Sequence, residues 1–520
     1  MLRAFVVITA VALLATWPAG ARADRALSQV SLQERVDSAA PGATLNVDGG
    51  TYHETIVIDK PLSLAGTGLP VIDGDGRGDV VTITADNVSL SGFEIRGSGT
   101  AVSREPAAVK VENAHGVTLR ANRIRDSHFG IHVTASHHAT IAFNDIDAGS
   151  NTPIERRGHG IYLWEAGDSV IHGNTIRHAA DGIHLEFSDG NGIGQNVVEE
   201  SRYALHLMYS NNNKTLSNQF RHNLAGLVFM FSRDLLVKDN EIASNRRGAT
   251  GAGLLLKDVD NIFVEGNTVV RNKYGLTAEG TPQAAGSTAV FLHNLFALND
   301  TGLGLMSNAP ITFVENSMVE NTVQVKALGG DLGGEVLPGH GAAAPAPVQA
   351  DTGGHAGHPA NGATIDEAQA QAGALPETAA WTVGGRGNYW SDYRGYDANG
   401  DGVGDRPYRP EPAFAGGLTD NDTLRLFQFT LGQQAIDAAA KMFPLFRYGS
   451  VIEDSGPLMS PVGPAIPDER GVNTSLIVVS GLLLLLAAAI LQSFLGLDPL
   501  VHAQRLAGRL TAGAGSDAAG

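Results

Sequence analysis

Histidine and methionine side chains at regular spacing are the most chemically suggestive feature of this chain. Of 17 histidines, 10 fall between His128 and His222, and the chain has no cysteine. A soft metal would therefore have to bind imidazole nitrogen and thioether sulfur, a donor set that suits copper better than Zn²⁺ or Mg²⁺. His184 and His206 stand 22 residues apart. Their spacing is meaningful only if the backbone repeats with the same period.

The backbone does repeat with that period. Nine Asn-x-apolar triplets follow one another at spacings of 22, 30, 22, 22, 22, 27, 27 and 22 residues. They begin at Asn122, Asn144, Asn174, Asn196, Asn218, Asn240, Asn267, Asn294 and Asn316. Short runs with period-2 alternation, as in 182–186, lie between Gly, Asn and Asp corners, and no 3.6-residue periodicity separates them. This pattern excludes helical and leucine-rich-repeat solenoids and predicts an all-β parallel β-helix with coils of about 22 residues.

Indexing the chain by this period places the candidate ligands in two columns. His184 and His206 become neighbours on successive coils, pointing away from the core, and the adjoining column holds Glu186, Met208 and Met230. Side chains one coil apart can share an ion, because metal–nitrogen bonds are only about 2 Å long. We expect this face to be exposed, so that a metal could be handed over. The alternative is that these columns only stabilise the sheet, as neighbouring side chains on adjacent strands commonly do.

A secreted β-helix could also be a carbohydrate-active enzyme (lyase, hydrolase or epimerase) or a polysaccharide-binding protein. Such chemistry needs paired carboxylates, or acids beside a basic residue, on the outer face. That face offers Glu186, Glu279 and Lys257, but on separate coils. The acids nearby are expected at corners: Asp181, Asp189, Glu199 and Glu200. Tyr162 and Trp164 could still stack on a sugar ring, which keeps a binding protein open as an alternative.

The N-terminus has the pattern of a secretory signal peptide over 1–23, with an apolar run before Ala21-Arg22-Ala23. Ser31 and Glu34 then form a capping box that opens a short helix, expected to close the end of the solenoid. The net charge of −18, without a basic patch, argues against nucleic acid.

The C-terminal third changes character repeatedly. Residues 329–378 are rich in Ala, Gly and Pro with scattered His, which is typical of a flexible insert whose histidines could also collect metal. The uncharged stretch Val472–Leu497 is long enough to span a bilayer, with a buried helix as the alternative. Arg505 and Arg509 after it place the tail in the cytoplasm. The expected parts are a signal peptide (1–23), a β-helix with its helical cap (24–328), the insert (329–378), a C-terminal segment (379–471), a transmembrane helix (472–497) and a cytoplasmic tail (498–520).

An Asp-rich loop lies within the C-terminal segment. Its oxygen-bearing side chains stand at Asp397, Asn399, Asp401 and Asp405. Such a run could hold Ca²⁺. It lacks the Glu that an EF-hand loop carries at its twelfth position, which here is Tyr408. A plain Asx turn accounts for it equally well.

Three motifs resemble the NosD family of periplasmic maturation proteins of nitrous oxide reductase. They are Asp181-Gly-Ile-His-Leu-Glu-Phe-Ser, Arg202-Tyr-Ala-Leu-His-Leu-Met-Tyr-Ser and Gly387-Asn-Tyr-Trp-Ser-Asp-Tyr with the loop after it. The resemblance covers roughly 40–328 and 379–460, and the last two motifs are its most specific part. Neither the insert 329–378 nor the span 472–497 belongs to the pattern, since the family is typically soluble in the periplasm.

The resemblance implies a right-handed parallel β-helix that is not an enzyme. It implies a docking scaffold that receives and passes copper during assembly of the copper–sulfur centre of nitrous oxide reductase. The implied partners are that reductase, an ABC transporter made of an ATPase and a permease, and a copper-chaperone lipoprotein. The implied copper ligands are His184, His206, Met208 and Met230, with Glu186 as an auxiliary ligand or a partner of the ligands. We expect a periplasmic protein anchored to the inner membrane by its C-terminal helix.

Overall fold

The computed structural model describes residues 31–150, 152–247, 251–305, 311–328, 380–410 and 452–467. The expected signal peptide, insert, membrane span and cytoplasmic tail lie outside these ranges. In the part that is described, no helix is long and apolar enough to cross a membrane. The described residues up to 464 form one compact unit, and of the second unit, 465–520, only 465–467 are described.

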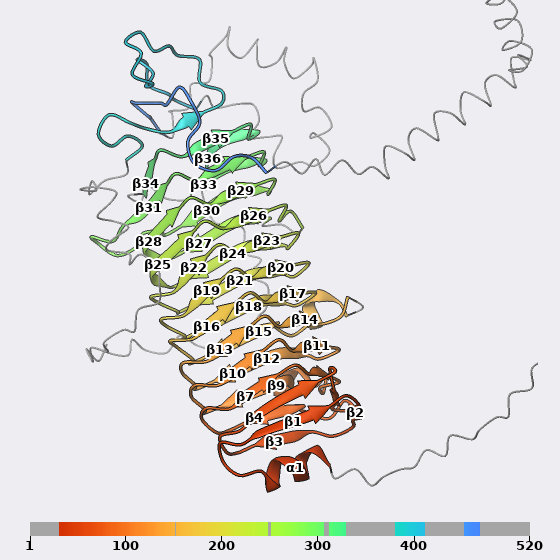
Figure 1. Ribbon diagram of the computed structural model, residues 1–520. Coiled ribbons are helices and arrows are strands. Elements are labelled where there is room, and N and C mark those ends of the chain that lie inside the picture. The colour runs from red at the N-terminus through yellow and green to blue at the C-terminus, as the bar shows by residue number, and fades with distance from the viewer. Residues whose placement is uncertain are drawn as a thin grey trace, which may run out of the picture. The chain divides into compact units, whose positions relative to one another are not determined.

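The compact unit is a β-helix built from three sheets (Figure 1). The first sheet contains β1 (Thr44–Asp48), β4 (Ser63–Thr67), β7 (Ser89–Ser91), β10 (Thr118–Arg120), β13 (Thr140–Ala142), β16 (Val170–His172), β19 (Gly192–Gly194), β22 (Lys214–Leu216), β25 (Arg233–Lys238), β28 (Asp260–Glu265), β31 (Ala289–Leu292) and β34 (Ile311–Val314). The second contains β2 (Thr51–Tyr52), β5 (Val71–Asp73), β8 (Glu94–Arg96), β11 (Arg123–Arg125), β14 (Asp145–Asp147), β17 (Thr175–Arg177), β20 (Val197–Glu199), β23 (Gln219–Arg221), β26 (Glu241–Ala243), β29 (Thr268–Val270), β32 (Leu295–Ala297), β35 (Ser317–Val319) and β37 (Tyr389–Trp390). The third contains β3 (Ile56–Ile58), β6 (Val81–Ile83), β9 (Ala107–Glu112), β12 (Phe129–Thr134), β15 (Ile161–Trp164), β18 (Asp181–Glu186), β21 (Tyr203–Met208), β24 (Ala225–Met230), β27 (Ala252–Lys257), β30 (Tyr274–Glu279), β33 (Thr301–Leu305) and β36 (Val323–Ala327).

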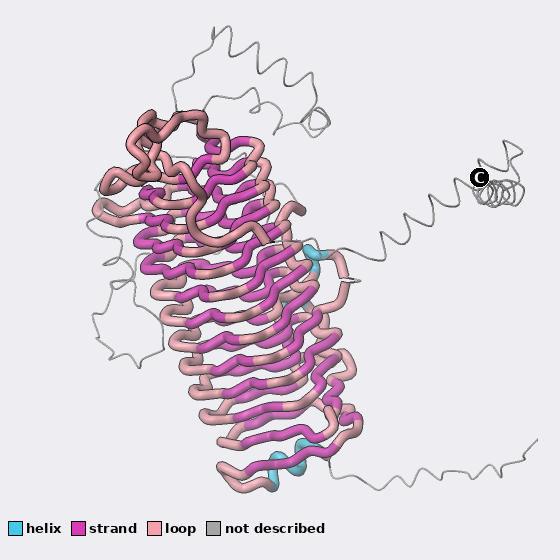
Figure 2. The backbone as a smooth tube through the Cα atoms, turned by 45° about the horizontal axis from the view of Figure 1, so that its top comes forward, coloured by secondary structure: helices cyan, strands magenta, loops and turns pink. Residues whose placement is uncertain are grey.

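Each coil contributes one strand to each sheet, and the strands pair in parallel with the equivalent strands of the coils on either side. Figure 2 shows the strands stacked in register, with loops at the corners between them. The predicted all-β parallel β-helix is confirmed. Short 3₁₀ helices at Val102–Arg104 and Ile154–Arg156 occupy two of the loops.

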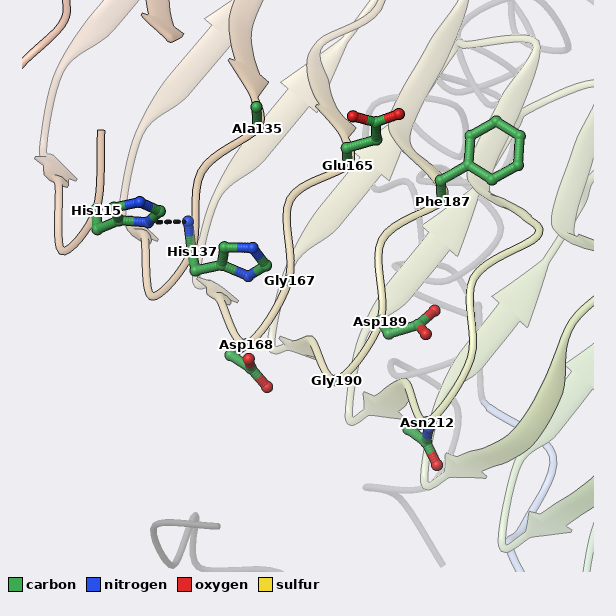
Figure 3. Close-up of a pocket in the computed structure, with 10 residues that line it drawn as sticks. All are labelled: His115, Ala135, His137, Glu165, Gly167, Asp168, Phe187, Asp189, Gly190 and Asn212. Atoms are coloured by element: carbon green, nitrogen blue, oxygen red, sulfur yellow. Dashed lines mark hydrogen bonds between the residues drawn. The ribbon is translucent and has the colours of Figure 1, made fainter. Parts of the chain in front are cut away.

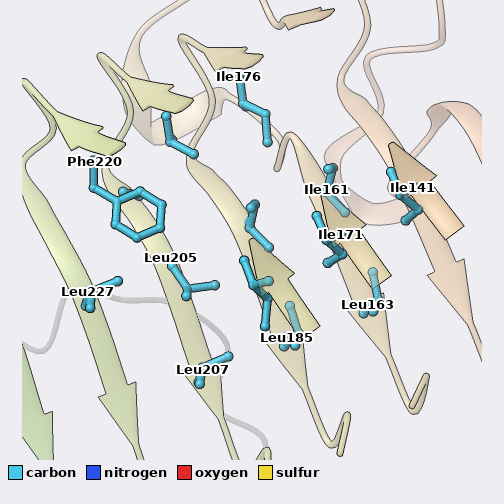
Figure 4. Packing of buried hydrophobic residues seen from close by; sticks show 14 of the residues in the cluster. Ile141, Ile161, Leu163, Ile171, Ile176, Leu185, Leu205, Leu207, Phe220 and Leu227 are labelled. Atoms are coloured by element: carbon cyan, nitrogen blue, oxygen red, sulfur yellow. The ribbon is translucent and has the colours of Figure 1, made fainter. Parts of the chain in front are cut away.

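Apolar side chains from the three sheets fill the interior. In β18, Ile183 and Leu185 are fully buried, and Leu205 and Leu207 of β21 pack in the same columns one coil further on (Figure 4). Each such side chain contributes about 1.5–3 kcal/mol by leaving water. The alternation read from the sequence therefore marks the core face, and the opposite face of these strands is left for polar groups.

The asparagines of the repeat form a buried ladder. The Asn218 side chain, for example, donates to Asn240 Oδ1 at 2.9 Å and to Ile193 O at 2.9 Å. Its own Oδ1 accepts from the backbone N–H of Asn196 at 2.9 Å and from Asn196 Nδ2 at 3.0 Å. One asparagine per coil therefore satisfies the polar groups of a buried corner, which explains the period of the triplets.

The two ends of the described coil are closed differently. The capping box predicted at Ser31 and Glu34 is present and opens α1 (Leu32–Ser38), which buries Leu32 and Val36 against the first coil. At the other end Asn388 continues the ladder by accepting from Asn316 Nδ2 at 3.0 Å, although 72 residues separate the two in sequence. Strand β37 pairs with β35 beside it. The chain therefore resumes the coil after the insert.

Candidate metal site

The structure brings His184 and His206 together as the repeat predicted. They stand opposite each other in the parallel pairing of β18 with β21. Their rings stack with centroids 4.4 Å apart and planes inclined by 9°. The stack continues backwards, since the ring centroid of Tyr162 lies 5.0 Å from His184 and 4.8 Å from His132. Four aromatic rings on successive coils thus form one column on the outer face of the third sheet.

The expectation that this column is exposed is wrong. His184 and His206 are each only 8% exposed, although both point away from the apolar core. His206 lies edge-on against Tyr203, and His184 lies edge-on against His159, so rings from neighbouring positions cover the pair. The two histidines therefore belong to a polar cluster that lies outside the apolar core but is buried from water.

Asp181 lies at the centre of this cluster, and the sequence reasoning misplaced it at a corner. It is the first residue of β18, and its side chain is fully buried. Its carboxylate accepts hydrogen bonds from Arg202 Nε at 2.8 Å and from the terminal nitrogen Nη2 at 2.9 Å. The carboxylate oxygen Oδ2 also lies 3.0 Å from His206 Nδ1.

Strict alternation fails at the residue after Asp181. A side-chain carbon at Gly182 would lie 2.2 Å from Val198 Cγ1, so this position faces the core, as Ile183 does. Two consecutive inward positions bring Asp181 to the same side of the strand as His184. The glycine marker was visible in the sequence, but period-2 indexing does not reveal that the alternation breaks there.

His159 is a second residue that the column indexing missed. It stands one coil before Asp181, whose backbone N–H donates to His159 Nδ1 at 3.2 Å. The other ring nitrogen, Nε2, lies 3.3 Å from Nδ1 of His184. Ligand-capable atoms of His159, Asp181 and His184 all lie within 4.8 Å of one another, which is close enough to hold a metal ion. The only indication in the sequence was membership of the histidine-rich stretch.

Burial sets the protonation of these groups. Loss of solvation lowers the pKa of His159 to about 4 and the pKa of His184 well below its ordinary 6.5. Burial alone would raise the pKa of Asp181, but Arg202, with help from His159 and His206, holds it well below 3.8. Near neutral pH, His159 and His184 are therefore uncharged, and the Asp181 charge is balanced by Arg202. Uncharged imidazole is the form that binds metals.

Two imidazole nitrogens in the cluster have no hydrogen-bond partner. Nε2 of His184 and Nε2 of His206 are both buried and unpaired. An unsatisfied buried polar atom costs about 1–3 kcal/mol, so native structures seldom leave two side by side without a reason. A bound metal would give such atoms a partner.

The adjoining column is arranged as predicted. Glu186, Met208 and Met230 stand opposite one another on β18, β21 and β24, and all three are partly buried. The Glu186 carboxylate accepts a hydrogen bond from the Tyr162 hydroxyl at 2.8 Å. Both thioethers therefore lie on the same face of the sheet as the two imidazoles, in a column two residues further along the strands. Their role as ligands stays a prediction.

The structure gives less support to carbohydrate chemistry than to metal binding. The ring of Tyr162 lies between His132 and His184, so it has no free face for a sugar, whereas Trp164 is 37% exposed. Glu279 pairs with Lys257 at 3.4 Å. On the outer face of the third sheet, as far as it is described, Glu186 and Glu279 remain on separate coils. Asp181, which shares β18 with Glu186, already accepts hydrogen bonds from Arg202.

An aromatic ladder, exposed at Phe187 and Phe231 and half-buried at Tyr209, borders the methionine column. Phe187, Tyr209 and Phe231 each follow the last residue of a strand, and their rings stack with centroids 5.2 and 5.0 Å apart. Phe187 also lines a groove of about 570 Å³ formed by the loops between the third and first sheets (Figure 3). Acidic residues, including Asp168 and Asp189, line the same groove. The surface beside the candidate ligands thus combines a strip of stacked aromatic rings with an acidic groove.

The Asp-rich loop uses its oxygens for its own backbone. Asp397 accepts from the N–H groups of Gly400 at 2.6 Å and Gly402 at 2.8 Å. Asp405 accepts from the N–H of Ala398 at 2.6 Å. Asn399 and Asp401 each accept from the N–H two residues on, at 3.0 and 2.8 Å, as in Asx turns. The calcium site expected at Asp397, Asn399, Asp401 and Asp405 gains no support.

Comparison with known proteins identifies the family. A protein of Pseudomonas aeruginosa named "Probable ABC transporter binding protein NosD" is 31% identical over 453 residues, which cover 85% of this chain and 96% of that protein. The chain belongs to the NosD family. A protein of the same name from Stutzerimonas stutzeri is 30% identical, over 79% of this chain and 85% of that protein. The sequence profile described as "Periplasmic copper-binding protein (NosD)" matches residues 148–333, which contain the whole cluster.

Solved structures resemble the coil only distantly. The A-module of the mannuronan C-5 epimerase AlgE4 of Azotobacter vinelandii matches with 13% identity and a TM-score of 0.43, over 57% of this chain and 92% of that module.

Proposed function

We propose that this chain is a non-enzymatic periplasmic accessory protein that receives copper and passes it on during assembly of the copper–sulfur centre of nitrous oxide reductase. The observation that carries the proposal is the pair of buried, unpartnered Nε2 atoms of His184 and His206 on adjacent coils. The description of the matching family as a periplasmic copper-binding protein supports the choice of metal.

The donor set would hold copper as cargo. His184 and His206 supply imidazole nitrogen, and Met208 and Met230 supply thioether sulfur, with Glu186 as the auxiliary group. Imidazole and thioether are ligands that copper accepts and that Mg²⁺ and Ca²⁺ do not prefer. Because the buried charges of Asp181 and Arg202 already balance, an incoming cation meets no uncompensated positive charge.

The partners follow from the names of the relatives and from the surface. Both relatives are named as ABC transporter binding proteins, which supports docking to an ATPase–permease complex. The aromatic ladder of Phe187, Tyr209 and Phe231 is an apolar strip beside the methionine column, where a copper-chaperone lipoprotein would deliver its ion. The right-handed coil, the signal peptide 1–23 and a membrane anchor at Val472–Leu497 complete the proposal.

Copper binding by the full chain tests the site. We expect the double variant His206→Ala with Met208→Ala to lose bound copper. The matched control, His222→Ala with Met459→Ala, removes an exposed histidine and an exposed methionine outside the cluster and should bind normally. Unchanged copper stoichiometry and affinity in the first variant would move the site elsewhere. In the cell, replacing the gene by the first variant should lower the copper content of nitrous oxide reductase.

A further inference from the structure

Asp181 contacts the histidine cluster through two groups of opposite character. Its side chain carries a hydrogen-bond acceptor toward His206, and its backbone carries a donor toward His159. A neutral imidazole has one protonated and one unprotonated nitrogen. Each contact therefore determines, for the imidazole ring that it touches, which of the two nitrogens carries the proton.

The side-chain contact acts on His206. The carboxylate oxygen Oδ2 lies 3.0 Å from His206 Nδ1, and a carboxylate that also accepts two bonds from Arg202 can only accept here. His206 Nδ1 must therefore carry a proton and donate it. In the neutral ring the other nitrogen, Nε2, is then an unprotonated lone pair, and this is the atom that is buried without a partner.

The backbone contact acts on His184 through His159. An amide N–H is always a donor, so His159 Nδ1, at 3.2 Å, accepts, and the His159 proton sits on Nε2. The competing arrangement, with Nδ1 donating to Asp181 Oδ2, would need to span 3.6 Å. His159 Nε2 then donates to His184 Nδ1 at 3.3 Å, which leaves the His184 proton on Nε2.

We propose that Asp181 holds the two stacked imidazoles in opposite tautomers, so that His206 is the ligand prepared for copper and His184 is held back. His206 presents a lone pair at Nε2, whereas His184 presents an N–H at the equivalent atom. His184 joins the site only when its proton moves from Nε2 to Nδ1, which requires His159 to stop donating there. Asp181, Arg202 and His159 are positioning residues, and this order of binding rests on the proposed function.

Two matched variants should therefore weaken copper binding to different extents. Carboxylates that orient a metal-binding histidine typically change metal affinity by 10–100-fold. We expect His206→Gln to weaken copper binding by more than about 100-fold and His184→Gln by less than about 10-fold, since only the first removes a prepared lone pair. In the double variant Asp181→Leu with Arg202→Met, which removes both buried charges and the hydrogen-bond acceptor at position 181 together, copper affinity should fall by about 10–100-fold while the chain stays folded.

The tautomers are read directly in the metal-free protein. Long-range ¹H–¹⁵N NMR spectra of the full chain labelled at histidine distinguish protonated from unprotonated ring nitrogens, and peaks lost in the two Gln variants assign the rings. We expect the His206 proton on Nδ1 and the His184 proton on Nε2, and we expect the His206 tautomer to change in the double variant. Copper affinity is then measured by anaerobic titration with Cu(I) against a competing chelator.

The outcomes separate the two proposals. Copper binding with the tautomers exchanged, or with His184→Gln at least as damaging as His206→Gln, would overturn the inference alone. Tautomers as expected but no copper binding would overturn the proposed function and leave the tautomer assignment standing. An unchanged His206 tautomer in the folded double variant would remove Asp181 from its positioning role.

Discussion

Removing Arg202 from beneath the histidine cluster should destabilise the protein strongly and in a pH-dependent way. In Arg202→Met, Asp181 loses the two hydrogen bonds of 2.8 and 2.9 Å and keeps only His206 as a side-chain partner. Its carboxylate is fully buried, so water cannot replace the guanidinium. Breaking a buried ion pair on one side costs about 3–5 kcal/mol of unfolding free energy.

The pH dependence follows from the direction of the Asp181 pKa. In the parent chain the folded-state pKa is depressed, so the pair contributes stability above the unfolded value of about 3.9, and this stability is lost as pH falls through the folded pKa. In Arg202→Met, burial raises the folded pKa above the unfolded value, and stability then falls as pH rises from about 4 toward that raised pKa. The difference between the chains is therefore largest near neutrality, smaller near pH 4, and lost only as pH falls through the depressed folded pKa of Asp181 in the parent.

Urea unfolding followed by far-UV circular dichroism at several pH values measures this difference. The matched control is Arg221→Met, because Arg221 grips Glu241 through the same two nitrogens at 2.9 and 2.7 Å, yet both side chains are about 30% exposed. Loss of an ion pair so close to solvent should lower the free energy of unfolding by only about 0–1 kcal/mol. Equal losses in the two variants, or a loss in Arg202→Met that does not change with pH, would refute the reasoning.

Three further predictions concern other parts of the molecule. Asn218→Ala should lower the free energy of unfolding by about 2–4 kcal/mol, because it leaves buried backbone groups on neighbouring coils without partners. The exposed Asn46→Ala should change it by less than about 0.5 kcal/mol in the same urea series, and equal effects would mean that the ladder is not stabilising. Tyr209→Ser, which interrupts the aromatic ladder, should weaken copper transfer from the chaperone about tenfold, in line with the loss of one interface aromatic, while intrinsic copper affinity stays the same. Transfer at the parental rate would place docking elsewhere. Adding Ca²⁺ or a chelator should leave the thermal midpoint of unfolding unchanged, because backbone N–H groups already occupy the Asp397 carboxylate. A Ca²⁺-dependent rise that is lost in Asp397→Ala would restore the cation site.

The regular part of the fold was predictable because its physical cause is local and periodic. A buried corner needs one asparagine per coil, and a strand with one face in the core needs apolar residues at alternate positions. Both requirements leave marks at fixed spacing, from which the neighbours on adjacent coils follow. The stacking of His184 on His206 and the alignment of Met208 with Met230 were obtained in this way.

The irregular parts were not predictable by the same route. Asn388 continues the ladder, but the insert removes it from the period, and only the contact with Asn316 reveals its place. Tyr162 was considered as a sugar platform, yet its neighbours on the adjacent coils cover both ring faces.

The sequence of this chain was sufficient to establish its architecture and to bring imidazole and thioether donors onto one face, because a solenoid turns spacing along the chain into proximity. Only the tertiary structure revealed that the imidazoles are sheltered and that Asp181 and His159 join them. The break in alternation at Gly182 brings Asp181 to the side of the strand that carries the rings, and burial then decides which nitrogens are uncharged and unpaired. Those properties depend on the surroundings of each atom in three dimensions, which no repeat period records.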